Sequence, residues 1–227
     1  MQIVITVGYS QDNLSMYPYF LKEINGVSTI LEEVLNSLKA EEHEVIFIIN
    51  SWLEKKYNLS LILKQLLNKC QVVVYDNNTK GALCTFLLGI DKYNLNDCMT
   101  ICSIDQIIKF DINDFLKDSK KNHYDASTVT FKSIHPKWSH VNIKDGLVVE
   151  ASGKKTISNV ASTGIYYFNK GTELVEYAKR FIKKYNDHDN YYVNYVLNEY
   201  ILDSKIVGAY GIDSSDIIFY KENTNGM

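Results

Sequence analysis

The chain lacks the features that mark several specialised classes of protein. No apolar run reaches about eighteen residues, so no segment is long enough to cross a membrane as a helix. The formal net charge is −3 and no long basic stripe occurs, which argues against a nucleic-acid partner. Proline occurs only 2 times, and no linker-like stretch divides the sequence. Residues 1–227, of which 46% are hydrophobic, are therefore expected to form one domain with a sizeable core.

Cysteine and histidine patterns argue against the common disulfide and metal frameworks. The 4 cysteines lie in apolar segments without C-x-x-C spacing, so buried free thiols are expected. The 5 histidines are scattered, and no pair has the spacing of metal ligands on one helix face. The first residues, Met1 to Val7, are strand-like and have neither the basic start nor the cleavage site of a signal peptide. These patterns predict a cytoplasmic protein.

The first half of the chain alternates strand-like and helix-like segments. Short apolar runs predict strands, and 3.6-residue periodicity predicts helices between them. The first helix carries Thr29 and Glu32 at capping-box spacing. Such alternation is typical of a parallel sheet with right-handed crossovers. The predicted strands are 3–7, 45–49, 71–75 and 99–102, and the predicted helices are 29–38, 53–67 and 81–93.

The second half has more strands and a hairpin. Lys144-Asp145-Gly146 is a turn signal between two short strands, and Asp111 is interpreted as a helix N-cap. The predicted strands are 126–131, 141–143, 147–150, 164–168 and 205–209, and the predicted helices are 172–185, 191–202 and 214–220. Residues 1–110 and 111–227 are therefore treated as two subregions of one domain.

Asp105 stands at the carboxyl end of the predicted strand 99–102. Open α/β sheets bind ligands in the crevice beyond such strand ends. A carboxylate there can hold a hard divalent cation, which in turn holds phosphate oxygens. The alternative is that Asp105 caps the element that follows, and the residue alone leaves both interpretations open.

Several short motifs follow one another along nearly the whole chain. They are Thr79-Lys80-Gly81-Ala82-Leu83-Cys84-Thr85, Ser103-Ile104-Asp105-Gln106, His135-Pro136-Lys137-Trp138-Ser139, the stretch from Ile157 to Phe168, Tyr191-Tyr192-Val193 with Asn198-Glu199, and the stretch from Gly211 to Ile217. In this order and spacing they resemble the sugar-1-phosphate nucleotidyltransferases, or pyrophosphorylases, and in particular the short members of capsule and lipopolysaccharide gene clusters. The resemblance implies the nucleotide-diphospho-sugar transferase fold. This is an α/β fold, a single Rossmann-like, three-layer domain with a mixed, mainly parallel sheet that is similar to the GT-A fold.

The resemblance also implies a two-part site and its ligands. It implies Mg²⁺ at Asp105, a nucleoside triphosphate or nucleotide sugar, and a phosphorylated sugar or similar small phosphate. The composition predicts no nucleic-acid or membrane partner, and a homo-oligomer is possible. The implied catalytic residues are Asp105 and Lys22. Residues 1–110 form the nucleotide-binding half, with Gly8, Tyr9, Lys80, Gly81 and Ala82. Residues 111–227 form most of the sugar or acceptor half, whose implied contacts are Gln106, Gly146, Lys154, Gly164 and Tyr166.

Each of these residues also has a simpler interpretation. Gly81 is either an ordinary helix start or a point of close backbone approach to a nucleobase. Lys22, Lys80 and Lys154 are either solvated surface lysines or phosphate contacts. Tyr166 and Tyr167 alternate along a strand, so one is expected in the core and the other in the cleft.

The chain departs from the family pattern where phosphate charge is neutralised. The loop after the first strand, residues 8–13, has one glycine and no arginine. Tyr19 stands where the family has a lysine, and Gly153 stands where it has a glutamate. The second acidic metal ligand, expected near Gly208, is absent. Because nucleotidyl transfer depends on positioning and charge neutralisation, these losses predict altered or reduced activity.

Three functions remain from the sequence. The leading one is nucleotidyl transfer in surface-polysaccharide synthesis, by in-line attack of an acceptor phosphate on the α-phosphorus with release of pyrophosphate. The second is a non-catalytic protein of the same fold that binds a nucleotide or sugar ligand. The third is a glycosyltransferase that uses a finished nucleotide sugar. That class generally has a D-x-D metal motif, which Asp105-Gln106-Ile107 does not supply.

Overall fold

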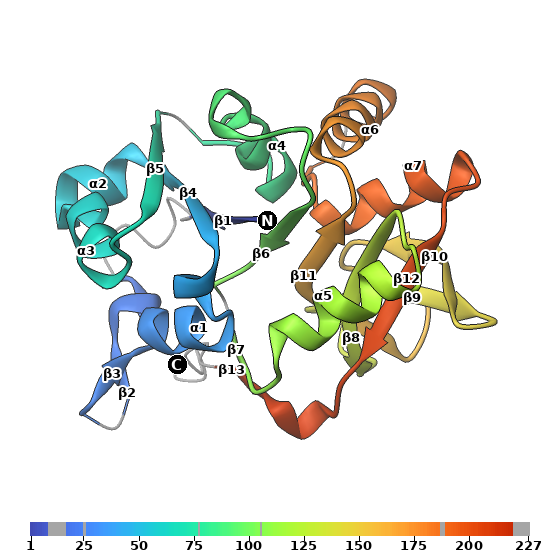
Figure 1. The fold of residues 1–227 in the computed structure, drawn as a ribbon, viewed down its shortest axis with the longest axis horizontal. Coiled ribbons are helices and arrows are strands. Elements are labelled where there is room, and N and C mark those ends of the chain that lie inside the picture. Colours follow the sequence, from blue (N-terminus) through green and yellow to red (C-terminus); the bar gives the residue numbers. More distant parts are fainter. Residues whose placement is uncertain (9–16, 25, 77, 105, 187–188, 220–227) are drawn as a thin grey trace.

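A nine-stranded mixed β-sheet forms the centre of the molecule (Figure 1). The structure is a computed structural model and describes residues 1–8, 17–24, 26–76, 78–104, 106–186 and 189–219. The strands lie in the order β5 (Cys70–Tyr75), β4 (Glu44–Asn50), β1 (Gln2–Val7), β6 (Met99–Cys102), β11 (Val160–Phe168), β8 (Ala126–Lys132), β12 (Val207–Gly211), β10 (Leu147–Ser152) and β9 (Ser139–Lys144). One sheet therefore runs through both halves of the chain.

The predicted strands of the first half are neighbours and are parallel. β1 pairs with β4 on one side and with β6 on the other, and β4 pairs with β5. In the second half β11 pairs antiparallel with both β6 and β8, while β12 returns parallel to β8. The parallel strands are joined by helical crossovers, whereas short turns suffice for antiparallel neighbours. The mixed α/β sheet is thus confirmed, with its parallel part concentrated in residues 1–110.

Helices cover both faces of this sheet. The α-helices are α1 (Ile30–Ser37), α2 (Ser51–Tyr57), α3 (Leu59–Leu66), α4 (Ala82–Leu87), α5 (Ile112–Lys121), α6 (Gly171–Lys184) and α7 (Val196–Leu202). Single 3₁₀ turns are η2 (Tyr19–Leu21), η3 (Ala40–Glu42), η4 (Ile90–Lys92), η5 (Val193–Tyr195) and η6 (Ser214–Asp216). Two small sheets pair β2 (Glu23–Ile24) with β3 (Ser28–Thr29) and β7 (Gln106–Ile108) with β13 (Ile217–Phe219).

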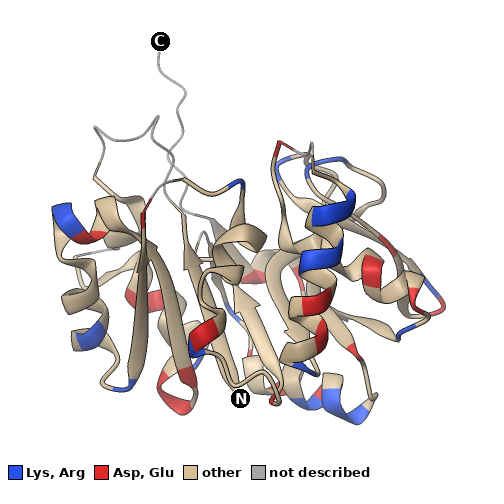
Figure 2. Ribbon diagram, turned by 90° about the horizontal axis from the view of Figure 1, so that it is seen from above, with Lys and Arg blue, Asp and Glu red and all other residues tan. Residues whose placement is uncertain are grey.

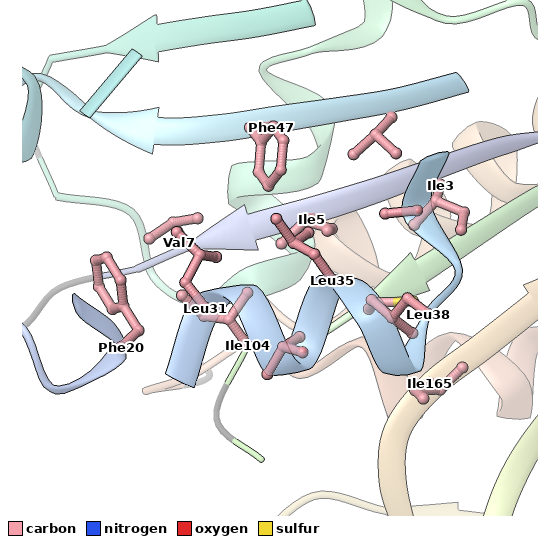
Figure 3. Packing of buried hydrophobic residues seen from close by; sticks show 14 of the residues in the cluster. Ile3, Ile5, Val7, Phe20, Leu31, Leu35, Leu38, Phe47, Ile104 and Ile165 are labelled. Atoms are coloured by element: carbon pink, nitrogen blue, oxygen red, sulfur yellow. The ribbon is translucent and has the colours of Figure 1, made fainter. Parts of the chain in front are cut away.

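Two hydrophobic clusters, one on each face, make the three layers. Ile3 and Ile5 of β1 pack with Leu31 and Leu35 of α1 in the first cluster (Figure 3). Val4, between them in sequence, belongs to the second cluster, which contains residues of α4, α6 and α7. Successive side chains of a strand point to opposite faces, so a strand that is apolar at every position is buried on both. Each such Ile or Leu contributes roughly 1.5–3 kcal/mol on burial.

Local capping signals form as predicted. At the start of α1 the Glu32 backbone N–H donates to the Thr29 hydroxyl at 3.2 Å, and the Thr29 N–H donates to the Glu32 carboxylate at 2.6 Å. At α5 the Asn113 N–H donates to the Asp111 carboxylate at 2.9 Å. Each cap satisfies backbone donors that the first helical turn leaves unpaired.

Two predicted helices are interrupted. Asn58 has a φ of 49°, a left-handed conformation, and splits the predicted helix 53–67 into α2 and α3. The predicted helix 81–93 is likewise α4 followed, after Gly89, by the 3₁₀ turn η4. Apolar periodicity continued across both breaks, because the segments on either side pack into the same hydrophobic cluster: α2 and α3 into the first, and α4 and Ile90 of η4 into the second.

The prediction of a terminal helix over 214–220 is wrong for the residues described. Ser214–Asp216 form a 3₁₀ turn, and β13 then pairs antiparallel with β7, with Ile217 opposite Ile108. A short apolar run such as Ile217-Ile218 fits a strand or a helix, and the strand partner at β7 decides between them.

The described surface carries charges of both signs. Figure 2 shows acidic and basic positions interspersed along the helices and loops of the ribbon, while the central strands carry few. Within the ranges that the structure describes, no helix combines the length and hydropathy needed to span a bilayer. The thiols of Cys98 and Cys102 are buried and those of Cys70 and Cys84 partly buried, and none is in a disulfide.

Candidate functional site

A cavity of about 710 Å³ opens beyond the carboxyl ends of β1 and β6. From β1 the chain proceeds outward through β4 to β5 and then returns to the other side of β1 as β6. Crossovers that diverge from neighbouring parallel strands leave a crevice at the strand ends, which is where α/β sheets bind ligands. Both halves of the chain line the cavity: Gly8 and Gly81 come from residues 1–110, and Lys154 and Gly164 from residues 111–227.

Gly81 packs closely against another segment of the chain. Its φ is 117°, and a Cβ built on it would lie 2.8 Å from the carbonyl oxygen of Tyr191. The Tyr191 N–H donates to the Lys80 carbonyl at 2.6 Å, and the Leu83 N–H donates to the Tyr191 carbonyl at 3.1 Å. The close approach at this glycine is therefore to the 190–191 segment, and the predicted nucleobase contact stays a prediction. Ala82 also lines the cavity.

Two threonines in the same motif close the turn around Gly81. The hydroxyls of Thr79 and Thr85 lie 2.6 Å apart, and the Thr85 hydroxyl donates to the Gly81 carbonyl at 3.2 Å. Both line the cavity, although the sequence analysis singled out neither as a contact. Their place in the motif from Thr79 to Thr85 was the available signal.

The end of β6, the start of β7 and the middle of β11 meet at Gly164. Its φ is 86°, and a Cβ there would lie 3.2 Å from Cβ of Ser103 and 3.7 Å from Nε2 of Gln106. The Ser103 N–H donates to the Gly164 carbonyl at 3.2 Å. The β11–β8 register shifts between Ser162 and Tyr166, around this glycine. The left-handed residue thus lets β11 pass close to Gln106, which is buried and lines the cavity.

Tyr166 and Tyr167 alternate as predicted. Tyr166 lines the cavity, whereas Tyr167 packs in the first cluster with its ring edge toward Phe115. Burial raises the pKa of Tyr166 to about 12, and the neighbouring side chains of Ser162 and Ser139 partly offset that rise. The hydroxyl therefore stays protonated at neutral pH.

Lys154 reaches the cavity from the segment after β10. Its Nζ donates to the carbonyl of Lys137 and lies 5.3 Å from the ring centroid of Tyr192. A Cβ on the preceding Gly153 would meet Cδ2 of Tyr192 at 2.5 Å and the hydroxyl of Tyr195 at 2.6 Å. Aromatic rings therefore occupy the space that a side chain at position 153 would need.

Other predicted residues lie away from the cavity lining. Lys22 ends η2 and accepts a hydrogen bond from the Ile30 N–H at 3.0 Å through its carbonyl. Lys80 is exposed beside Gly81, and Gly146 occupies the β9–β10 hairpin, where its φ is 81°. The structure does not bring these three to the cavity wall. Asp105 and Tyr9 lie outside the described residues.

The lining side chains that the structure describes are cationic or neutral. Lys137 and Lys154 carry charge, the others are hydroxyl, amide, aromatic or apolar, and no carboxylate is among them. No three His, Cys, Asp or Glu side chains of the described ranges gather as a metal site. Because Mg²⁺ binds through carboxylates and waters, this part of the lining does not by itself fit that ion.

Several lining residues were missed by the sequence analysis. Lys137 and Ser139 lie in the quoted motif from His135 to Ser139, and Tyr192 lies in the motif from Tyr191. The missed lining residues that bear a hydroxyl or amide group and fall outside every quoted motif are Thr6, Tyr75, Asn78 and Asn190. Motif position was thus a usable signal for most of the missed contacts.

Comparison with known proteins places the fold. No family model matches the sequence, and no curated protein is significantly similar to it. Among solved structures, a nucleoside-diphosphate-sugar pyrophosphorylase from Vibrio cholerae RC9 is 20% identical with a TM-score of 0.80, covering 96% of this chain and 95% of that one. The inositol-1-phosphate CTP transferase from T. maritima is 14% identical with a TM-score of 0.71, covering 99% and 89%. A UDP-glucose pyrophosphorylase solved with UDP-glucose is 14% identical with a TM-score of 0.70, covering 93% and 90%. The chain therefore has the fold of these nucleotidyltransferases.

Proposed function

We propose that the protein is a nucleotidyltransferase that joins a nucleotide to a phosphorylated sugar or similar small phosphate and releases pyrophosphate. One observation carries the proposal. One cavity, beyond the carboxyl ends of β1 and β6, is lined by residues of both halves of the chain. Gly8, Gly81 and Ala82 come from the first half, and Lys154, Gly164 and Tyr166 come from the second. A cavity with two such halves can hold two ligands side by side, which transfer between them requires.

The reaction forms one bond and breaks one. An oxygen of the acceptor phosphate attacks the α-phosphorus of the triphosphate, and the bond from that phosphorus to the bridging oxygen breaks, so pyrophosphate leaves with the electron pair. The protein's contribution is alignment of the two phosphates and neutralisation of their charge. Lys154 and Lys137 are the described cationic side chains of the lining, and we propose that they bind the acceptor phosphate.

Turnover is expected to be slow. Lys22 and Lys80, the cations proposed for the triphosphate, do not line the cavity. Fixed positive charge near the leaving group is usually the largest single contribution to such a reaction. The same observation favours a second candidate, a non-catalytic protein that binds a nucleotide or sugar ligand.

Further parts of the proposal rest on the sequence resemblance. They are a role in surface-polysaccharide synthesis, a cytoplasmic location, assembly into a homo-oligomer, and Mg²⁺ bound through Asp105. Asp105 lies three residues after the end of β6 in the sequence, next to Ile104, which lines the cavity. No step of the reaction above is routed through the ion.

A matrix of nucleoside triphosphates and sugar 1-phosphates, assayed for pyrophosphate release, tests the proposal. A thermal-shift screen of the same compounds runs beside it, because a ligand that binds the folded state raises its stability whether or not chemistry follows. Pyrophosphate release with any pair supports the transferase. Binding without release supports the non-catalytic candidate, and neither binding nor release overturns both.

A further inference from the structure

β5 is the last strand at one end of the nine-stranded sheet (Figure 1). Within the described ranges it pairs with β4 alone, so the backbone N–H and C=O groups that point away from β4 have no strand partner there. The opposite end of the sheet is partly closed, because β9 pairs with β11 as well as with β10. β5 therefore leaves an open edge along its full length of 6 residues.

Both faces of β5 are packed, yet the strand is more exposed than its neighbour. Cys70 and Val72 pack against the first hydrophobic cluster, and Val73 and Tyr75 pack in the second. Only Tyr75 of β5 is buried, whereas every residue of β4 after Glu44 is buried. Because the two faces are occupied, the exposure of β5 comes from its open edge.

β5 has none of the features that usually keep an exposed strand edge from pairing. Such edges carry charged residues, proline or a β-bulge. The strand reads Cys-Gln-Val-Val-Val-Tyr, without a charge or a proline, and its register with β4 runs without a shift. An uncharged edge rich in β-branched residues is suited to pairing with another strand.

The charges that flank β5 indicate which strand fits. Lys69 directly precedes the strand and Asp76 directly follows it, and both side chains are exposed. In an antiparallel pair the start of one strand lies beside the end of the other. A second β5 that runs antiparallel would therefore bring opposite charges together at both ends of the joint. A parallel pair would bring like charges together, which destabilises strand pairing.

We propose that this edge binds a second copy of the chain, with β5 antiparallel to β5. A two-fold axis perpendicular to the sheet relates the copies, and the two nine-stranded sheets continue as one. Assembly stops at two copies because the pairing uses the open β5 edge of both. The proposal does not depend on the proposed function, since Tyr75 is the residue of β5 that lines the cavity and the joint uses the strand edge.

Sedimentation velocity and hydrogen–deuterium exchange of the full chain test the interface. A dimer is expected at micromolar concentration, with slow exchange of the β5 amides that point away from β4. A monomer overturns the proposal and leaves the proposed nucleotidyl transfer standing. A dimer in which those amides exchange rapidly places the interface elsewhere and also overturns it.

Charge exchange tests the antiparallel direction. Lys69→Glu and Asp76→Lys each bring like charges together at both ends of the joint, so each should weaken dimerisation about tenfold. The double variant restores opposite charges and should recover nearly the wild-type dissociation constant. Both positions are exposed and lie outside the strand, so the fold should be kept. Single variants that dimerise like wild type, or a double variant that does not recover, overturn the proposal.

A charge placed within the edge gives an independent test with a matched control. Val74 of β5 is 45% exposed and Val149 of β10 is 43% exposed. Val74→Lys is expected to give a folded monomer, because a lysine on a strand edge opposes edge pairing. Val149→Lys should remain dimeric, and circular dichroism checks that both variants are folded. A folded Val74→Lys variant that dimerises like wild type overturns the proposal, and if this variant does not fold, the charge-exchange series decides.

Discussion

A methyl group on Gly81 would overlap the 190–191 segment, and this contact ties two distant parts of the cavity wall together. The ideal Cβ lies 2.9 Å from the Tyr191 nitrogen as well as 2.8 Å from its carbonyl oxygen, and φ is 117°. We expect Gly81→Ala to lower the free energy of unfolding by about 2–4 kcal/mol, since strain and overpacking add. Gly211→Ala, which meets no described atom within 4 Å, should change it by less than about 1 kcal/mol. Urea unfolding followed by circular dichroism measures both, and equal losses would contradict the packing argument.

Lys154 is the residue whose charge the proposed function needs most. Lys154→Met keeps the aliphatic stem and removes the ammonium group. We expect it to weaken binding of the best sugar phosphate from the thermal-shift screen about tenfold, the size of one charge-assisted hydrogen bond. Lys155→Met removes the same charge from an exposed neighbour that does not line the cavity and should leave the affinity unchanged. Calorimetry decides, and the same loss in both variants would indicate a general electrostatic effect.

Asp105 is the carboxylate that we propose as a ligand of Mg²⁺. Asp105→Asn keeps the shape and the capping ability and removes the charge, so stability should barely change. If Asp105 binds Mg²⁺, nucleotide affinity in the presence of the ion should fall on the order of tenfold or more. Titration of nucleotide into both proteins, with and without Mg²⁺, gives four affinities. Four equal values would exclude a metal role for Asp105.

At the scale of elements, the break between α2 and α3 depends on one residue. Asn58 sits at a φ of 49°, where its N–H still donates to the Glu54 carbonyl at 2.9 Å. Asparagine and glycine tolerate this conformation, whereas in other residues it costs about 1–2 kcal/mol of conformational free energy. We expect Asn58→Gly to change the thermal midpoint little and Asn58→Ala to lower the free energy of unfolding by about 1 kcal/mol. If Asn58→Ala is the more stable of the two, the continuous helix predicted from periodicity is accessible after all.

At the scale of the whole molecule, ion pairs join elements that are distant in the chain. Lys39, before η3, lies 2.6 Å from Asp111 at the start of α5. Arg180 of α6 lies 2.9 Å from Asp203 at the end of α7 and 2.6 Å from the buried Glu199. Hydrogen bonds from Lys39 and Arg180 lower the pKa of Asp111 and Asp203 respectively.

These pairs predict a dependence of stability on pH. A carboxyl whose folded pKa lies below its unfolded value stabilises the fold fully above about pH 4 and loses that contribution as the pH falls through the folded pKa. The urea midpoint should therefore drop as the solution is acidified below about pH 4. The double variant Asp111→Asn, Asp203→Asn should show a shallower drop, while Asp91→Asn on the exposed surface should follow wild type. A wild-type midpoint that is flat over this range would contradict the assignment.

Much of the cavity wall could be predicted from the short sequence motifs, because several of the segments that line the cavity contain one. Gly8, Gly81, Gln106, Lys154, Gly164 and Tyr166 all line it. Lys22, Lys80 and Gly146 do not line it. The carbonyls of Lys22 and Lys80 accept backbone hydrogen bonds, and Gly146 occupies a hairpin turn. Proximity in sequence to a motif therefore did not determine whether a long side chain points into the cavity.

The sequence by itself determined the elements whose signals are local. Short, continuous apolar runs made strands of 2–7 and 44–50, and the Thr29–Glu32 box began α1, because each depends on residues within a few positions of one another. Only the tertiary structure decided that Ile217–Phe219 is a strand on β7, that β12 lies between β8 and β10, and that the hydroxyls of Thr128 and Ser162 lie 2.8 Å apart. Hydrogen bonds between such distant residues have no local signature, since their free energy is gained only when the partner segments are brought together.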